Sequence, residues 1–411
     1  MHVSGHSTTA RGGQLAGPNR VRFSRICKTP RRESVSLCQA EAVDPGDVFS
    51  TPMVALPGQP PAVPWPTKSW PRGDPSSVPT ALDPLLDDAF DTGGPLAETH
   101  AVVIISGGRL VAERYGGFEP RSKRMIPFGP DTTLRSWSIA KSMLHGAVGL
   151  MVRDGRLDLD TPAPVPQWVG RGDPRGAITL EQLLLMRDGL DFAEDYVERG
   201  RSDVREMLWG PGRTDVATFA AARPLATVPG EAFHYSSGAT NIVSGVLARL
   251  LGPAPPYRRF LSDRLFNPIG ATSAVAGFDE AGTWVASSTV FATARDFARF
   301  GLLYLRDGIW DGRRLLPERW VDHGRLPRSI DPDDGMVHGA HWWVVGDRYG
   351  SFWASGYRGQ SLLLSPALDL VVVRLGDTPT ERSDALTRWN ADLVTAFAGV
   401  RGAGAWPADG R

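Results

Sequence analysis

The chain has 411 residues, 42% of them hydrophobic, with 45 basic and 45 acidic residues and a formal net charge of zero. This length and composition fit one large domain or two closely joined domains with a sizeable core. Nucleic-acid binding is not expected, because a neutral chain offers no basic field to hold a polyanion. No apolar stretch approaches the ~18–20 residues of a membrane span, and the N-terminal region lacks the apolar core of a secretory signal, so we expect a cytoplasmic protein.

Both cysteines, Cys27 and Cys38, lie near the N-terminus. The remaining chain therefore has no thiol that could act as a nucleophile, ligate a metal or form a disulfide framework.

The two ends of the chain are expected to lie outside the folded domain. Residues 1–50 are polar and basic without hydrophobic periodicity, which predicts a disordered tail, and 401–411 is expected to be a second tail. Residues 51–90 are rich in proline and form either a linker or an extended arm. The tryptophans Trp65 and Trp70 favour an arm that packs on the body.

The folded domain is expected at 91–400. Residues 101–117 contain two strand-like runs separated by the Gly107-Gly108 pair, which predicts a hairpin. Residues 138–155 are apolar on nearly every face, as in a buried helix.

The other elements are placed by caps and periodicity. Thr179 and Gln182 form a capping-box pattern before a short helix, and further helices are expected at 238–252, 293–308 and 382–400. Short runs rich in Trp, Val and Leu after Gly339 predict consecutive antiparallel strands. The fold class is therefore α+β: an antiparallel sheet built from about 95–135 and 335–400 and flanked by helices, with a mostly helical part inserted at about 140–330.

The segment 135–146, RSWSIAKSMLHG, holds the last of only four lysines in the chain. On a helix, Ser138 and Lys141 lie three residues apart on one face and can touch. Burial lowers a lysine pKa from its ordinary ~10.4, and the neutral amine can then accept the serine hydroxyl proton. Arginine cannot, because its pKa exceeds ~12. The pair indicates a nucleophile and its base, with the Ser138 backbone N–H facing a developing oxyanion.

Each motif has a second interpretation when it is taken alone. A Ser-x-x-Lys match also arises by chance in a chain of this length. The sequence HYSSGATN at 234–241 either supplies the phenol of Tyr235 as a second proton-transfer group or contains a buried tyrosine followed by capping serines. The sequence SGYRGQ at 355–360 either brings a backbone N–H close to a ligand or is a Gly-rich bend of the sheet.

Taken together, SIAK at 138–141, YSS at 235–237 and the Gly-rich strand near 356 resemble the serine β-lactamase-like superfamily in order and spacing. That superfamily includes class C β-lactamases, D-alanyl-D-alanine peptidases (penicillin-binding proteins), family VIII esterases and 6-aminohexanoate-dimer hydrolases. The similarity covers about 95–398. It is closest to the 6-aminohexanoate-dimer hydrolases, through segments like those at 189–197, 293–301 and 342–366.

The resemblance implies an α/β domain with an antiparallel sheet, an all-helical domain and a site between them. It assigns Ser138 as nucleophile, Lys141 as base and Tyr235 as proton shuttle, with the backbone N–H groups of Ser138 and Tyr357 as the oxyanion hole. It implies that Tyr196 closes over the substrate, unless that tyrosine is a surface aromatic. By the same resemblance, the residues that would contact substrate are Tyr196, Ser237, Ser355, Gly356 and Trp343.

Two positions depart from the β-lactamase pattern. The late strand carries Ala354-Ser355-Gly356 where β-lactamases have Lys-Thr-Gly, so an anionic β-lactam loses its cation. Arg358 either partly substitutes for that cation or is a solvated arginine. Ser237 stands where β-lactamases use asparagine. Trp209, Trp342 and Trp343 suggest an aromatic-lined pocket or are core residues.

The sequence therefore favours a serine hydrolase that cleaves small esters or amides without a metal or cofactor. One alternative is a D-alanyl-D-alanine peptidase or a weak β-lactamase-type enzyme, and another is a non-catalytic binding module on the same fold. His145 and His234 are expected to be structural. The substrate and the oligomeric state stay open.

Overall fold

The computed structural model describes residues 47–74, 78–118, 126–170, 172–196 and 200–401. Cys27, Cys38 and most of the two expected tails lie outside these residues. Asp47–Phe49, at the end of the expected tail, form a short 3-10 helix in which Val48 is buried.

The main sheet has eight strands in the order β10-β11-β12-β13-β14-β15-β1-β2. Every neighbouring pair is antiparallel. The β1–β15 pair joins the first and last strands in sequence, so both ends of the folded region build one sheet. The strands are β1 (Glu98–Ser106), β2 (Arg109–Tyr115), β10 (Ser329–Ile330), β11 (Val337–His338), β12 (Trp343–Val344), β13 (Phe352–Gly356), β14 (Gln360–Ser365) and β15 (Leu370–Asp377).

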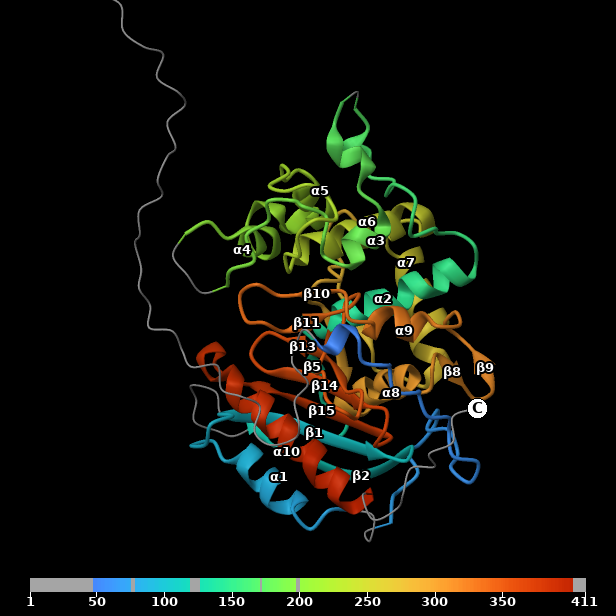
Figure 1. Cartoon of the computed structure of the whole chain (residues 1–411), viewed down its shortest axis with the longest axis vertical. Helices are drawn as coiled ribbons and strands as arrows, with labels where there is room; N and C mark the ends of the chain where they lie inside the picture. The colour runs from blue at the N-terminus through green and yellow to red at the C-terminus, as the bar shows by residue number, and fades with distance from the viewer. Residues whose placement is uncertain (1–46, 75–77, 119–125, 171, 197–199, 402–411) are drawn as a thin grey trace, which may run out of the picture. The chain divides into compact units, whose positions relative to one another are not determined.

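The described helices and the smaller strands complete the fold (Figure 1). The helices are α1 (Leu82–Phe90), α2 (Ile139–Arg153), α3 (Leu180–Leu184), α4 (Asp203–Leu208), α5 (Val216–Ala221), α6 (Ser237–Leu251), α7 (Pro256–Leu261), α8 (Ala294–Leu305), α9 (Trp320–Arg325) and α10 (Ser383–Arg401). The smaller strands are β3 (Gly117–Phe118), β4 (Ile126–Pro127), β5 (Thr133–Arg135), β6 (Val275–Ala276), β7 (Val290–Thr293), β8 (Ile309–Trp310) and β9 (Arg313–Arg314).

The central strands are covered on both faces. In β1, Val103 and Ile105 belong to the larger apolar core, which includes Phe297 of α8. The intervening Val102 and Ile104 belong to a second core that contains side chains of α1 and α10, and these two helices contact each other. A strand buried on both faces is a continuous apolar run rather than an alternating one, as the sequence VVII shows.

The proline-rich segment lies against the body through its tryptophans. The Trp65 and Trp310 rings are 5.1 Å apart, and Trp310 donates its indole N–H to the Thr67 hydroxyl at 2.8 Å. Trp70 is buried, with the Arg299 guanidinium 5.5 Å from its ring centroid. These contacts fix the segment in an extended course along α8 and β8.

The α+β prediction is confirmed, and so are its main local elements. Gly107 and Gly108 have φ of +57° and +72° in the β1–β2 turn, a conformation that glycine adopts without strain. The Thr179–Gln182 capping box is present. One boundary differs: β5 does not join the main sheet but pairs with β7. No helix in the described part of the chain is long and apolar enough to cross a membrane.

Candidate active site

The Ser-x-x-Lys segment begins the buried helix α2, with Ser138 as its N-cap residue. Two hydrogen bonds between Ser136 and Val290 tie the preceding residues to β7, one from the Ser136 N–H at 2.8 Å and one to its hydroxyl at 3.0 Å. Trp137 has a φ of +46°, a strained conformation for a bulky residue. The chain therefore makes a sharp turn immediately before Ser138, and the helix start leaves the Ser138 N–H without an intrahelical acceptor.

Lys141 reaches back to Ser138, as its position on the helix predicted. Its Nζ lies 3.0 Å from the Ser138 Oγ, 2.9 Å from the Ser237 Oγ and 3.0 Å from the Ser287 carbonyl oxygen. Only 2% of the residue is exposed. Burial lowers the pKa of Lys141 to about 8, while the Glu194 carboxylate opposes the shift. A substantial fraction of the amine is therefore neutral near physiological pH.

Glu194 joins this network without any signal in the sequence that singled it out. One of its oxygens accepts the Ser237 hydroxyl proton at 2.6 Å, and the other accepts the Ser237 backbone N–H at 2.8 Å. Ser237 is the first residue of α6, where N–H groups lack intrahelical acceptors and an anion is stabilised.

Tyr235 lies on the other side of the catalytic pair. The Lys141 Nζ is 5.0 Å from its ring centroid, and the ring stacks on Trp343 at 5.5 Å. Burial is the main cause that raises the pKa of Tyr235, and its contact with Ser138 opposes this. The phenol therefore keeps its proton at neutral pH and can donate it.

The end of β13 packs tightly against the turn before the nucleophile. A Cβ at Gly356 would lie 2.7 Å from the Ser136 carbonyl oxygen, closer than a side-chain carbon can approach. Tyr357 follows directly after this strand, and its ring contacts Trp137 at 5.2 Å. The backbone of the β13–β14 turn is thus held beside Ser138.

Four aromatic rings form a rim over the nucleophile. Tyr196 stacks on Tyr357 at 4.6 Å, and Trp137 meets Tyr196 and Trp209 edge to face at 6.5 Å and 6.3 Å. Trp209 is 52% exposed. Burial is the main cause that raises the pKa of Tyr196, and the proximity of its hydroxyl to Ser237 opposes this.

Two histidines line a small cavity of about 10 Å³ behind the catalytic residues. Burial lowers the pKa of both His338 and His341 to about 3, so both are neutral. His341 bonds to the Leu184 carbonyl at 2.8 Å and to the Thr240 hydroxyl at 3.0 Å. The other residues around the cavity are Ser138, Lys141, Ser142, Tyr235, Trp343, Ala354 and Ser355.

The arginines near the site are committed to other partners. Arg358 forms an ion pair with Asp377 and its side chain is 40% exposed, which fits a solvated arginine rather than a free cation for a substrate carboxylate. The Arg135 guanidinium lies 3.9 Å from the Trp137 ring centroid and donates to the Ser288 carbonyl at 3.1 Å.

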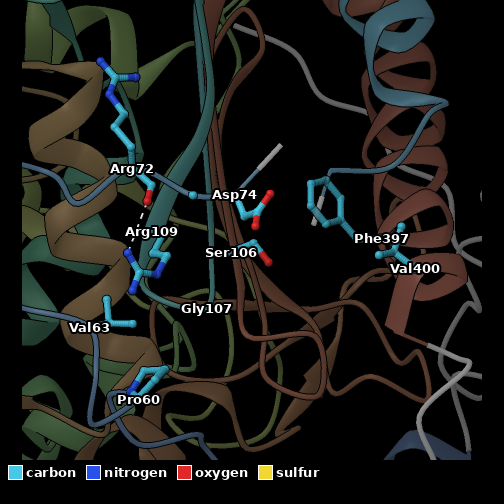
Figure 2. A pocket seen from close by; sticks show the side chains of 10 residues that line it. Pro60, Val63, Arg72, Asp74, Ser106, Gly107, Arg109, Phe397 and Val400 are labelled. Carbon is cyan, nitrogen blue, oxygen red and sulfur yellow. Dashed lines mark hydrogen bonds between the residues drawn. The ribbon is translucent and has the colours of Figure 1, made fainter. Parts of the chain in front are cut away.

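A larger cavity of about 640 Å³ lies elsewhere, between the proline-rich segment, the β1–β2 turn and α10. Figure 2 shows Arg109 donating to the Arg72 carbonyl there, at 3.2 Å. None of the predicted catalytic residues lines it, so its size does not make it the site. Nor does any group of three or more His, Cys, Asp or Glu in the described residues form a metal site.

The structure brings the predicted residues Ser138, Lys141 and Tyr235 together, and it changes the interpretation of two others. Ser237 is fully buried, its N–H and its hydroxyl proton are bonded to Glu194, and its oxygen accepts from Lys141, so it has no donor left for a substrate. Trp342 is fully buried in the main core and is not a pocket wall. Sequence reasoning missed Glu194, Ser287, His338 and His341, because only the fold brings these residues to the helix start. It also missed Arg135 and Trp137, which directly precede Ser138 in the sequence but match no catalytic motif.

Comparisons with known proteins identify the family and the fold. The family model described as Beta-lactamase matches residues 96–396. The 6-aminohexanoate-dimer hydrolase of Paenarthrobacter ureafaciens is 28% identical over 347 residues, which are 76% of this chain and 83% of that protein.

Solved structures share the fold at lower sequence identity. A putative 6-aminohexanoate-dimer hydrolase from Bacillus anthracis has a TM-score of 0.66 at 21% identity and covers 87% of this chain and 94% of its own. A family VIII carboxylesterase has a TM-score of 0.62 at 17% identity and covers 78% and 98%.

Proposed function

The chain belongs to the beta-lactamase family, and from that premise we propose that it is a serine hydrolase that cleaves small esters or amides through an acyl-enzyme on Ser138. The observation that carries the proposal is the buried Lys141 amine, 3.0 Å from the Ser138 hydroxyl, with its pKa lowered to about 8. A neutral amine at this distance is an adequate base for a serine.

In the acylation step, the Ser138 Oγ bonds to the substrate carbonyl carbon while its proton passes to the Lys141 Nζ. The negative charge moves to the carbonyl oxygen, where the N–H groups of Ser138 and Tyr357 would stabilise it. The bond to the leaving group then breaks. Tyr235 donates its phenolic proton to the departing alkoxide or amide nitrogen and recovers a proton from the Lys141 ammonium.

In the deacylation step, water attacks the acyl-enzyme carbonyl and loses a proton to the same basic groups. The bond to the Ser138 Oγ breaks, and the oxygen takes up a proton again. The net reaction consumes one water and releases an acid and an alcohol or amine. The cavity behind Ser138 and Lys141 has room for about one water molecule, since about 10–15 Å³ suffices and its volume is about 10 Å³.

The charges around the site support uncharged substrates over β-lactams and D-alanyl peptides, which carry a carboxylate. Position 354 is alanine, and Arg358 is paired with Asp377. A non-catalytic binding module has no use for a buried lysine, which costs free energy wherever it is charged. A 6-aminohexanoate dimer, the substrate in the relative's name, is one amide to test; it carries a carboxylate, so the charge argument predicts that it reacts more slowly than an uncharged amide. The cytoplasmic location stays a prediction.

The test is labelling with a fluorophosphonate followed by intact-mass analysis. We expect one adduct on the wild-type protein, none on Ser138→Ala and strongly slowed labelling of Lys141→Ala. A folded wild-type protein that forms no adduct, or a Ser138→Ala variant that labels as fast as wild type, would contradict the proposal. A panel of p-nitrophenyl esters, linear amides and a chromogenic β-lactam then defines the substrate class.

A further inference from the structure

Glu194 has no role in the reaction scheme. Both of its carboxylate oxygens nevertheless accept hydrogen bonds from one residue, Ser237. Glu194 lies on the loop between α3 and α4 and accepts the N–H and the O–H of Ser237, at 2.8 Å and 2.6 Å. Neither bond touches Ser138, Lys141 or the rim where a substrate would enter. Any effect of its hydrogen bonds on the reaction must therefore pass through Ser237, while its charge also acts on the pKa of Lys141 through space.

The loop that carries Glu194 is held firmly in place. The Ala193 N–H donates to Asp203 at 2.8 Å, and Asp203 is bound by Arg201 at 2.6 Å and Arg223 at 2.8 Å. On the other side, His234 bonds to the Phe192 carbonyl at 2.6 Å. The carboxylate is thus aimed at Ser237 by its neighbours on both sides.

The number of protons on each group determines the direction of the hydrogen bonds between Glu194, Ser237 and Lys141. An ionised carboxylate has no proton to give, so the Ser237 hydroxyl must donate its only proton to Glu194. The same oxygen lies 2.9 Å from the Lys141 Nζ, and it can then only accept from the amine. Without Glu194, the hydroxyl would be free to donate to the amine lone pair instead.

The other contacts of Lys141 determine where the lone pair of its amine points. The Ser287 carbonyl, 3.0 Å from the Nζ, is an acceptor and takes one amine proton. Asn241 holds this residue in place through the Ser287 N–H and hydroxyl, both at 3.1 Å. A neutral amine has two protons and one lone pair. With the Ser287 carbonyl and the Ser237 oxygen each taking a proton, the lone pair points at the third neighbour, Ser138.

We propose that Glu194 is a positioning residue that, through the Ser237 hydroxyl, directs the lone pair of Lys141 at the nucleophile. This inference rests on the proposed function, because it assigns Lys141 the role of base. The same arrangement also serves the next step: once Lys141 has taken the Ser138 proton, the ammonium donates to three oxygens and lies one hydroxyl away from the Glu194 charge.

The charges that face Lys141 are few in the described structure. His338 and His341 are neutral, with their pKa lowered to about 3, and Tyr235 keeps its proton because burial raises its pKa. Glu194 is the group whose charge raises the pKa of Lys141 against the effect of burial. Removing that charge should therefore lower the pKa of Lys141 further.

The variant Glu194→Gln keeps the size and shape of the side chain but changes its hydrogen-bond donors and acceptors. A carboxamide has one acceptor oxygen and one donor nitrogen, so it cannot accept both protons of Ser237. We expect the rate constant for fluorophosphonate labelling to fall roughly 10- to 100-fold, the range for misdirected catalytic groups. Asp191→Asn is the matched control, because it removes one carboxylate charge from the same loop. The Asp191 side chain is 44% exposed and paired with Arg201. We expect this variant to label like wild type.

Two further readouts separate positioning from a merely structural cap on α6. In a Ser237→Ala background, Glu194→Gln should have little further effect on the labelling rate well above pH ~8, where Lys141 is already neutral, because the hydroxyl through which the carboxylate orients the amine is gone. In Glu194→Gln, the pH at which the labelling rate reaches half of its maximum should be lower than in the wild-type protein. A loosened, wetter helix start would move it upward instead, since burial is what lowers the pKa of Lys141.

The outcomes are distinguishable. A wild-type protein that does not label at Ser138 contradicts the proposed function. If wild type labels at Ser138, the positioning role is overturned by any of three results: an unchanged rate in Glu194→Gln, an upward pH shift, or additive effects in the double variant.

Discussion

Lys141 illustrates how one buried side chain sets the working range of the site. Burial lowers its pKa to about 8, so ~10% of the amine is neutral one pH unit lower, at pH 7. Burial also removes it from solvent, with 2% of the residue exposed. The few lysines in the chain make the position conspicuous, because arginine would stay charged at any accessible pH.

This assignment predicts the pH dependence of acylation. The reactive form is the neutral amine, so kcat/KM for a neutral ester should rise about tenfold per pH unit below pH ~8 and level off above it. The measurement is a pH profile of p-nitrophenyl acetate hydrolysis, corrected for spontaneous hydrolysis, with Lys141→Arg as an inactive control. A profile that is flat across pH ~8, or that falls as pH rises, would contradict the assignment of Lys141 as base.

The residues that sequence patterns predicted differ from those they missed in how far apart along the sequence their contacts lie. Ser138 and Lys141 interact within one helical turn, so their spacing alone predicts their contact. Glu194 reaches Ser237 across 43 positions, and Ser287 reaches Lys141 across 146. Contacts of that separation depend on how loops pack, which no local pattern encodes. For the same reason, Ser237 was expected to contact substrate when in fact it is buried in the network.

At the scale of elements, the strand β13 and the start of α2 must approach closely for the site to exist. Local patterns predicted both elements, because short runs rich in Trp, Val and Leu between glycines indicate strands and a segment that is apolar on all faces indicates a buried helix. They did not predict that β5 leaves the main sheet to pair with β7. That pairing brings the chain to the sharp turn at Trp137 immediately before the nucleophile.

Gly356 offers a test of this close approach. A Cβ there would lie 2.7 Å from the Ser136 carbonyl oxygen, so Gly356→Ala must push the end of β13 away from the nucleophile turn. Displacing the Tyr357 N–H should lower kcat roughly 100-fold, as losing an oxyanion donor does, with little change in KM.

The control is Gly129→Ala, because a Cβ at Gly129 has no neighbour within 4 Å. Thermal unfolding by circular dichroism shows whether each variant is folded. A fully active Gly356→Ala protein would show that the end of β13 takes no part in the reaction.

At the scale of the whole molecule, the site collects groups from both parts of the fold. Ser138 and Lys141 come from the start of α2, Tyr235 and Ser237 from the start of α6, and Tyr357 from the turn after β13 in the main sheet. Each group lies at the end of an element, where backbone N–H groups are free and side chains can converge. The family resemblance located this meeting point, while composition and charge only excluded other kinds of protein.

We expect the charge balance around this meeting point to influence which substrates are accepted. Glu194 contributes a negative charge one hydroxyl from Lys141, and the reactive form of Lys141 is neutral. Arg358 is bound to Asp377, and Arg135 lies over Trp137. A substrate carboxylate beside Lys141 therefore meets the Glu194 charge and gains no unpaired cation from Arg358, while the Arg135 guanidinium beside Trp137 keeps its own charge.

This balance predicts discrimination between two esters that differ in one charge. We expect kcat/KM for p-nitrophenyl butyrate to exceed that for the mono-p-nitrophenyl ester of succinate by roughly tenfold or more, equivalent to about 1.4 kcal/mol, the scale of one charge repulsion near a protein surface. High salt should narrow the gap, because screening weakens repulsion between exposed charges. Equal rates for the two esters, or a gap that salt leaves unchanged, would mean that shape rather than charge selects the substrate. A preference for the succinate ester would reveal a cation that binds carboxylates and would revive a β-lactamase-type activity.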